Sequence, residues 1–244
     1  MSIILIAASL FLIVLNYLLT IATAPLTLHQ KPLLAFISQQ VDLRNEANLA
    51  TWYSSAILFL AAIVAWLNSR TTSPFTKLKW THRLAWLLIA AVLMAISISE
   101  TAKIHENLVA VLNRQPIGQL QNYFQEGAGD WIFVLLPFII ATALGMFTFF
   151  IAAFWRCKKI MLLALAGILC WSTAILFEAI EGNFIKVILS RNVRGFIEES
   201  CEVIGTTFLL IAFVEYFKIR NAADVQADQN ELEDSPALSL VESN

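Results

Sequence analysis

The sequence has little charge, glycine or proline for its length. Of its 244 residues, 14% are charged, and there are 8 Gly and 6 Pro. Disordered and collagen-like chains need far more of these residues, so both classes are excluded. The hydrophobic share of 59% and the mean hydropathy of +0.72 exceed what a water-soluble domain of this length can bury. The composition therefore predicts a membrane protein.

The sequence also lacks the short motifs of several enzyme classes. It contains no GxxxxGK(S/T) loop, no GxGxxG turn, no GxSxG elbow and no HExxH helix. The net charge is −2 and the bases are scattered, so a nucleic-acid partner is not expected. The cysteines Cys157, Cys170 and Cys201 are predicted at three different membrane depths, which argues against a disulfide framework or a thiolate zinc site. Whether the protein is an enzyme stays open.

Six apolar stretches approach the about 20 residues that a helix needs to cross a hydrocarbon core. They predict helices over residues 2–24, 51–68, 81–99, 131–155, 160–181 and 197–217, the third with an amphipathic extension to residue 113. The first stretch has no basic region before it and Pro25 at the cleavage position, so we interpret it as a retained helix. The fold class is therefore all-α, with a six-helix transmembrane domain over residues 1–220.

Basic residues in two short loops predict the orientation. One loop contains Arg70, Lys77 and Lys79, the other contains Arg156, Lys158 and Lys159, and neither contains Asp or Glu. Because bases in short loops resist translocation, both loops are predicted to be cytoplasmic, and an even number of spans then makes both termini cytoplasmic. Residues 221–244 are polar and acidic without a periodic apolar face, which predicts a disordered cytoplasmic tail.

Eight ionisable residues collect at the opposite, outer ends of three predicted helices. They are Glu100, His105 and Glu106 after the third span, Glu178 and Glu181 at the end of the fifth, and Glu198, Glu199 and Glu202 at the start of the sixth. The apolar stretches 84–98 and 203–217 are short, at roughly 22 Å each, so they draw Glu100 and Glu202 toward the hydrocarbon. Since a charge facing lipid is disfavoured there, these carboxylates are expected to face the bundle interior.

A set of many carboxylates with one imidazole suits a hard or borderline divalent metal, namely Fe, Mn, Zn or Mg. The leading hypothesis is that this periplasm-facing cluster binds such a cation, either structurally or for metal-dependent chemistry on a membrane substrate. Glu178, Glu181 and Glu202 are the first expected ligands. A solvated acidic rim is the simpler alternative, but Glu100, Glu178 and Glu181 lie at helix C-termini, where the dipole opposes negative charge.

Two other functions stay open. In a cation or proton transporter or channel, the same carboxylates would form an outer vestibule. A conduction path should continue through polar groups toward the cytoplasm, but between Glu202 and Glu215 the sequence offers only Thr206 and Thr207. In a non-catalytic scaffold subunit, a membrane protein partner or a second copy of the chain would cover the acidic face. In each case the lipid bilayer is an expected partner.

Several polar and aromatic residues are predicted at helix ends. His82, beside Arg83, is interpreted as an interface residue. Asn48 is interpreted as the polar start of the second span, with a role as a further ligand as the alternative. Most tryptophans fall at predicted helix ends, where indole rings prefer the membrane interface, but Trp86 and Trp171 do not. The outer stretch 25–50 suits either a short interfacial helix or a plain loop.

The helix end that runs from Ser97 through Glu100 to His105 and Glu106 has the pattern SxxExxxxHE. Together with residues 48–55 and 198–205, it resembles an uncharacterised family of multi-pass bacterial inner-membrane proteins. In those proteins an acidic residue usually stands where this chain has Ser99. The resemblance implies a bacterial inner-membrane location and supports the interpretation of the outer acidic residues as one cluster. It implies no activity.

Overall fold

The computed structural model describes residues 2–23, 32–42, 48–71, 79–102, 130–179 and 191–233. Seven α-helices make up these residues: α1 (Ser2–Thr23), α2 (Pro32–Val41), α3 (Leu49–Asn68), α4 (Lys79–Ala102), α6 (Asp130–Phe154), α7 (Lys158–Ala179) and α8 (Arg191–Glu233). No strand occurs in this part of the chain. Six of the helices, all except α2, are long and apolar enough to cross a membrane. The prediction of an all-α fold with six membrane spans is confirmed.

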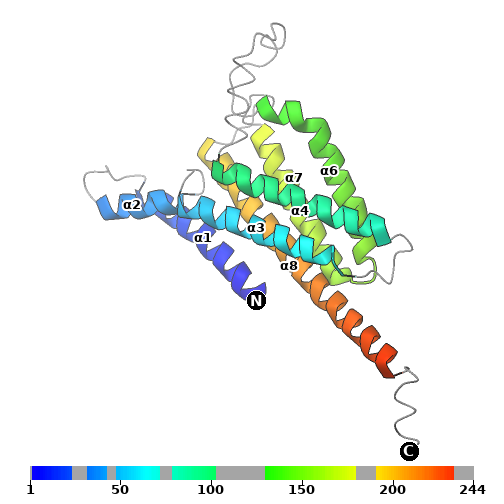
Figure 1. The fold of residues 1–244 in the computed structure, drawn as a ribbon. Helices are drawn as coiled ribbons and strands as arrows, with labels where there is room; N and C mark the ends of the chain where they lie inside the picture. The colour runs from blue at the N-terminus through cyan, green and yellow to red at the C-terminus, as the bar shows by residue number, and fades with distance from the viewer. Residues whose placement is uncertain are drawn as a thin grey trace, which may run out of the picture.

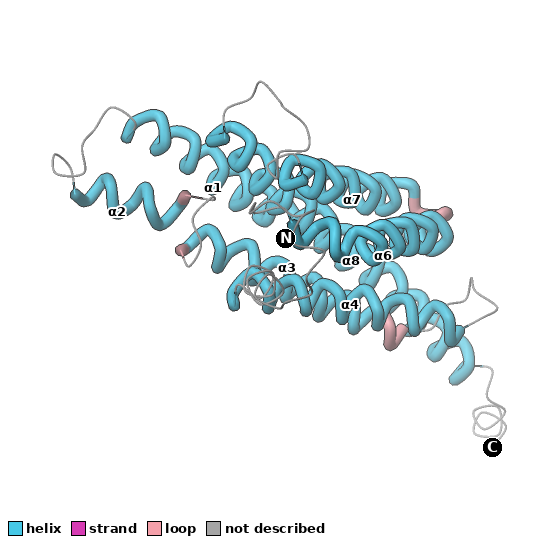
Figure 2. Tube along the Cα trace, turned by 90° about the horizontal axis from the view of Figure 1, so that it is seen from above, coloured by secondary structure: helices cyan, strands magenta, loops and turns pink. Residues whose placement is uncertain are grey.

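The helix α8 is the centre of the bundle. It packs most closely against α7, also contacts α3 and α1, and lies between α7 on one side and α3 on the other (Figures 1 and 2). In its spanning segment 61% of the residues are buried, against 11% for α6. The remaining close pairs are α3 with α4, α6 with α7, and α2 with α1 and α3. The interior of the protein is therefore built around one face each of α3, α4 and α7 and most of α8.

Two glycines allow α7 and α8 to approach each other closely. A Cβ atom added to Gly167 would lie 2.9 Å from the carbonyl oxygen of Gly205, and one added to Gly205 would lie 3.0 Å from the carbonyl oxygen of Gly167. An added side chain would require the Gly205 backbone and Leu209 to shift at position 167, and the Trp171 ring to shift at position 205. Small residues at such crossings are typical of membrane helix pairs, where association depends on close van der Waals packing.

Hydrogen bonds between hydroxyl groups connect the helices within their membrane-spanning segments. The Ser55 hydroxyl donates to the carbonyl oxygen of Ser97 at 3.0 Å, and the Ser97 hydroxyl donates to that of Ser55 at 2.9 Å, which joins α3 to α4. The Ser9 hydroxyl lies 2.8 Å from both the Tyr53 and the Thr207 hydroxyls, which joins α1 to α3 and α8. Because water is absent from a bilayer core, polar groups there need such protein partners.

The helix α2 and the start of α3 form a small unit at one end of the bundle. Asn48 caps α3 by accepting a hydrogen bond from the Thr51 backbone N–H at 3.0 Å, and its amide donates to the Asp42 carbonyl at 2.6 Å. Its interpretation as a polar helix start is confirmed. Leu33 and Phe36 are exposed on α2, as a short helix lying in the membrane interface requires.

The helix α8 is longer than the sequence predicts. It continues to Glu233 and projects beyond the other helices at its C-terminal end (Figure 1). Residues 221–233, which the sequence analysis assigned to a disordered tail, are therefore helical, and residues 234–244 lie outside the described part. The reason is that residues 217–233 contain neither Gly nor Pro, and a helix already formed in the membrane extends without a new nucleation step.

Candidate functional site

The C-termini of α4 and α7 and the N-terminus of α8 lie at the same end of the bundle, which we call the acidic end (Figure 1). Four of the predicted site residues have described side chains, and each of them is partly buried: Glu100, Glu198, Glu199 and Glu202. For Glu178 only the backbone is described. His105, Glu106 and Glu181 lie outside the described residues. Half of the predicted cluster can therefore be located by its side chains.

Glu100 continues the buried face of α4. Residues at spacings of three and four along this helix are all buried: His82, Trp86, Ile89, Leu93 and Ser97. The next position in the same pattern is Glu100. On α8 the buried positions Thr206, Leu209, Phe213 and Tyr216 extend backward at the same spacing to Glu202 and Glu199. The carboxylates therefore belong to the inward faces of their helices, since a helical face repeats at this interval.

The aromatic contacts between α4 and α8 show how these two helices run relative to each other. The two helices are antiparallel, because Trp86 contacts Phe213 with ring centroids 5.0 Å apart, while His82, earlier in α4, contacts Tyr216, later in α8. As many residues separate Trp86 from Glu100 as separate Glu199 from Phe213. Glu100 and Glu199 therefore lie equally far along their helices from this aromatic contact, toward the acidic end.

The contacts between α7 and α8 give the depth of Glu178. Glu178 follows Gly167 by as many residues as Arg194 precedes Gly205, so its backbone comes level with Arg194. By the same register, Glu202 comes level with Cys170. The backbones of Glu178 and Glu202 are thus separated by roughly 12 Å along the bundle. The side chain of Glu178 lies outside the described part, so its role as one of the first expected ligands stays a prediction.

Among the residues that the structure describes, no three or more His, Cys, Asp or Glu side chains gather in a way that could hold a metal ion. The four described glutamates therefore do not form a metal site by themselves. A site at this end needs ligands from the adjoining segments, which carry His105, Glu106 and Glu181. The described carboxylates supply negative charge, with oxygen ligands that hard cations prefer.

The opposite end of the bundle contains a buried polar network that the sequence analysis missed. Trp86 donates its indole N–H to Nε2 of His82 at 3.2 Å, and the Tyr216 hydroxyl lies 3.0 Å from the same nitrogen. An indole N–H can only donate, so Nε2 carries no proton and the hydroxyl of Tyr216 donates as well. The imidazole of His82 is therefore neutral, with its proton on Nδ1.

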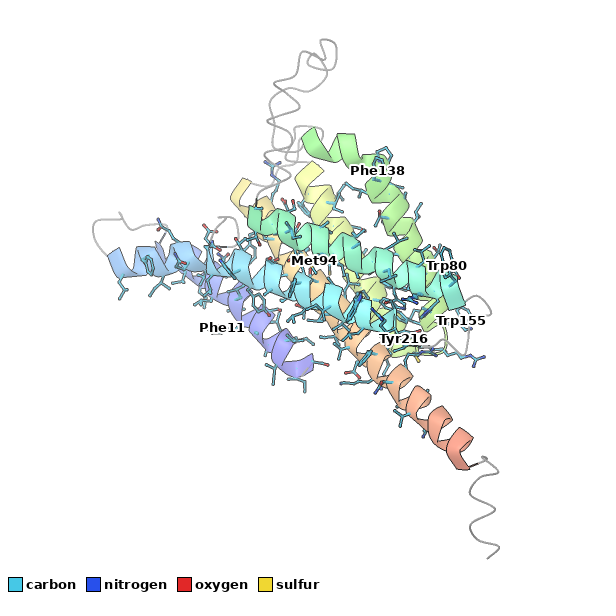
Figure 3. The ribbon with its side chains drawn as sticks, in the orientation of Figure 1. Phe11, Trp80, Met94, Phe138, Trp155 and Tyr216 are labelled. Atoms are coloured by element: carbon cyan, nitrogen blue, oxygen red, sulfur yellow. The ribbon has the colours of Figure 1, made fainter. Side chains whose placement is uncertain are left out.

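Aromatic rings surround this network. Trp86 is fully buried and contacts Phe149, Phe150 and Phe154 of α6 as well as Phe213 and Tyr216 of α8. Figure 3 shows Tyr216 at the same end as Trp80 and Trp155. Offset and edge-to-face ring pairs of this kind add to the energy of burial. The rings fill the space between α4, α6 and α8, whose backbones do not approach as closely as those of α7 and α8.

The interpretation of His82 as an interface residue is wrong. It is 4% exposed, because the spacing of His82 and Trp86 places both on the inward face of α4. The pattern of apolar residues that follows them, at Ile89 and Leu93, was the signal that could have revealed this burial. The same observation explains why Trp86 does not belong to the interfacial tryptophans.

Two further polar residues are buried near this network. Asn68, at the end of α3, is fully buried and donates from its amide to the Phe213 carbonyl at 3.1 Å. Arg220 is 1% exposed, with its guanidinium 5.9 Å from the centre of the Tyr216 ring. These contacts attach the ends of α3 and α4 to the same turn of α8. The network therefore has a structural role, in which polar atoms join three helices.

The positions of Trp171 and two of the cysteines are a further finding. Trp171 donates its indole N–H to the Thr206 hydroxyl at 3.1 Å, so it joins α7 to α8 inside the bundle. A Cβ atom on Gly205 would lie 3.0 Å from Cβ of Cys170, and Gly205 follows Cys201 by about one helical turn. Cys170 and Cys201 therefore lie at nearly the same depth, so the prediction of three different membrane depths is wrong for this pair. All three cysteines are free thiols.

These features define the class of protein: a multi-pass α-helical membrane protein in which six apolar helices pack through small residues and internal hydrogen bonds. Residues 4–216 match a family described as a domain of unknown function, DUF8692, and the chain belongs to this family. The match covers nearly the whole bundle and ends before the C-terminal part of α8. Neither the curated proteins nor the solved structures include a match to the chain.

Proposed function

We propose that this protein is a bacterial inner-membrane protein that binds a divalent cation at its acidic end. The observation that supports the proposal is that Glu100, near the end of α4, and Glu198 and Glu199, near the start of α8, are partly buried at the end of the bundle where these helix ends lie. Like charges in a partly dry site are costly unless bases, water, protons or a cation offset them. A divalent cation bound by these carboxylates would be one such charge.

The ligands of the proposed site come from three elements. Glu100 on α4, and Glu198 and Glu199 on α8, would supply carboxylate oxygens. His105 and Glu106, which follow α4 in the sequence, would complete the ligand set, with Glu181 contributing after α7. Such a mixture suits Mn, Fe, Zn or Mg.

In this proposal the acidic end faces the periplasm. The support comes from the bases of the two loops at the other end, which by the positive-inside rule stay in the cytoplasm. Reporter fusions after Lys79 and Lys159 test the orientation. Cytoplasmic reporter activity at both positions is expected, and periplasmic activity at either position would overturn it.

Metal analysis of the detergent-purified full chain, prepared without chelator, tests the cation site. We expect stoichiometric metal in the wild type and its loss in a Glu100→Gln, Glu199→Gln double variant that still elutes as a folded protein. The matched control is Glu215→Gln, which removes a carboxylate paired with Lys218 at the other end and is expected to retain the metal. A wild type that neither carries nor takes up Mn²⁺, Fe²⁺, Zn²⁺ or Mg²⁺ on dialysis would rule out the site.

A transporter or channel has less support. Between Glu202 and Glu215 the polar side chains Thr206 and Thr207 donate to the carbonyls of Glu202 and Val203, at 2.8 Å each. Further along α8, Leu209 packs against Gly167 so closely that a Cβ atom added to Gly167 would lie 2.8 Å from Cγ of Leu209. A conduction path would need polar groups and space in this segment. The scaffold alternative predicts a partner that co-purifies stoichiometrically.

A further inference from the structure

The end of the bundle opposite the acidic end carries three exposed tryptophans, and we call it the tryptophan end. Trp66 is 44% exposed, Trp80 is 72% exposed and Trp155 is 70% exposed. Indole rings combine a large apolar body with one N–H donor, so they prefer the level of the lipid headgroups. The tryptophan end is therefore where the protein meets the headgroups of one leaflet.

Bases stand next to two of these tryptophans. Arg83, Lys158 and Lys159 are exposed, and residues 79–83 and 155–159 contain no acidic residue. Glu215 of α8 is paired with Lys218, with 2.7 Å between the carboxylate and the ammonium. Its charge is thus already neutralised by a base of its own helix. The surface formed by α4 and the α6–α7 turn has a net positive charge.

The beginning of α4 and the α6–α7 turn border the same part of this surface. His82, next to Arg83, contacts Phe149 of α6 with ring centroids 5.7 Å apart. Trp86 contacts Phe154, the residue before Trp155, at 6.2 Å. Figure 3 shows Trp80 and Trp155 at this end of the two helices. The basic and aromatic residues of both elements are thus held together by the buried aromatic cluster.

We propose that this surface, formed by Trp80, Arg83, Trp155, Lys158 and Lys159, binds the headgroups of anionic phospholipids. Guanidinium and ammonium groups form charge-assisted hydrogen bonds to phosphate oxygens, and exposed indole N–H groups add donors at the same level. Leu84 and Leu88 are exposed on α4 beyond the bases, at 39% and 58%, and offer an apolar path for an acyl chain. That continuity of apolar surface favours a lipid over a free phosphate ion.

Quenching of tryptophan fluorescence by brominated lipids tests the proposal on the full chain reconstituted in bilayers. Brominated phosphatidylglycerol is expected to bind more strongly than brominated phosphatidylcholine at low salt. Each base removed should lower this preference by about fivefold, so we expect a decrease in Arg83→Gln and a larger one in a Lys158→Gln, Lys159→Gln double variant. The matched control is Lys218→Gln, a base at the same end that is already paired with Glu215, and it should retain the wild-type preference.

The possible results separate the proposal from its alternatives. Equal binding of the two lipids by the wild type would overturn it, as would an equal loss of preference in the control and the test variants. Arg83→Lys keeps the charge and should keep most of the preference, which distinguishes lost binding from lost folding. If inorganic phosphate displaces the lipid more than chloride does at equal ionic strength, the site binds a free anion and the lipid proposal fails.

Discussion

At the tryptophan end of the bundle, the buried polar atoms of His82, Trp86 and Tyr216 bind one another, whereas at the acidic end Glu100, Glu199 and Glu202 are partly open to solvent. Both sets lie on the inward faces of the same two helices, α4 and α8. The polar atoms of the first set are satisfied within the protein, so the set stabilises the bundle. The second set has like charges and carboxylate oxygens, the ligand type on which the proposed cation site depends. Position on an inward face therefore does not by itself assign a residue to structure or to function.

Removal of Trp86 is the strongest test of this contrast. Trp86→Ala would leave a large cavity among Phe149, Phe150 and Phe213, and we expect a loss of about 3–5 kcal/mol in the free energy of unfolding. The measurement is unfolding by denaturing detergent in mixed micelles, followed by circular dichroism. The control is Trp80→Ala, which truncates a ring that is 72% exposed and should have little effect. A similar effect of both variants would show that Trp86 does not hold the tryptophan end together.

A substitution where α7 and α8 cross should have the next largest effect on the free energy of unfolding. In Gly205→Ala the new Cβ atom would lie 2.8 Å from Cδ1 of Trp171 and 3.0 Å from the Gly167 carbonyl oxygen. We expect a destabilisation of about 1–3 kcal/mol from this overpacking. Gly145→Ala on α6 is the matched control, because nothing lies within 4 Å of its Cβ position, and alanine should there stabilise the helix by up to about 1 kcal/mol. Opposite signs in the same unfolding assay are the expected result, and equal shifts would contradict the close packing of α7 and α8.

A smaller effect is expected from the Tyr216 hydroxyl. Tyr216→Phe keeps the ring contacts but removes the donor to His82, and it should cost about 1 kcal/mol. Tyr17→Phe removes the hydroxyl of a ring that is 53% exposed and is expected to be neutral. If Tyr216→Phe were as stable as the wild type, the hydrogen bond would add nothing to the ring packing, and the contrast between the ends would rest on aromatic contacts alone.

The acidic end should have the smallest effect on stability. In the presence of a chelator, Glu100→Gln and Glu199→Gln are each expected to change the free energy of unfolding by less than about 1 kcal/mol. Added Mn²⁺ should then stabilise the wild type more than either variant, because a ligand that binds only the folded state raises its stability. A loss of several kcal/mol without metal would mean that the carboxylates are structural. That result would remove the contrast with the tryptophan end.

Residue order and composition predicted the spans, the exposed Trp80 and Trp155, and the polar start of α3 at Asn48. These features depend on the length of apolar stretches, on the preference of indole for the interface and on a local cap. They involve residues that are neighbours in sequence or that face the membrane, so no knowledge of helix packing is needed.

The extension of α8 past residue 217 was not predicted, because polar composition alone was taken as a sign of disorder. Over residues 217–233 the helix propensity of the residues and their continuity with a membrane span favour a helix despite the polar composition. A count of glycine and proline residues in this segment would have corrected the prediction.

The sequence by itself determined the class of protein, since an unsatisfied backbone in hydrocarbon is so costly that long apolar stretches can only be helices. It also placed the acidic residues at one end, because hydrophobic length fixes where each helix must stop. Only the tertiary structure decided that His82 and Asn68 are buried, that Trp86 packs against Phe213, and that Gly167 meets Gly205. These facts depend on which faces of different helices meet and at what register, and that choice is made by side-chain packing between residues far apart in the chain.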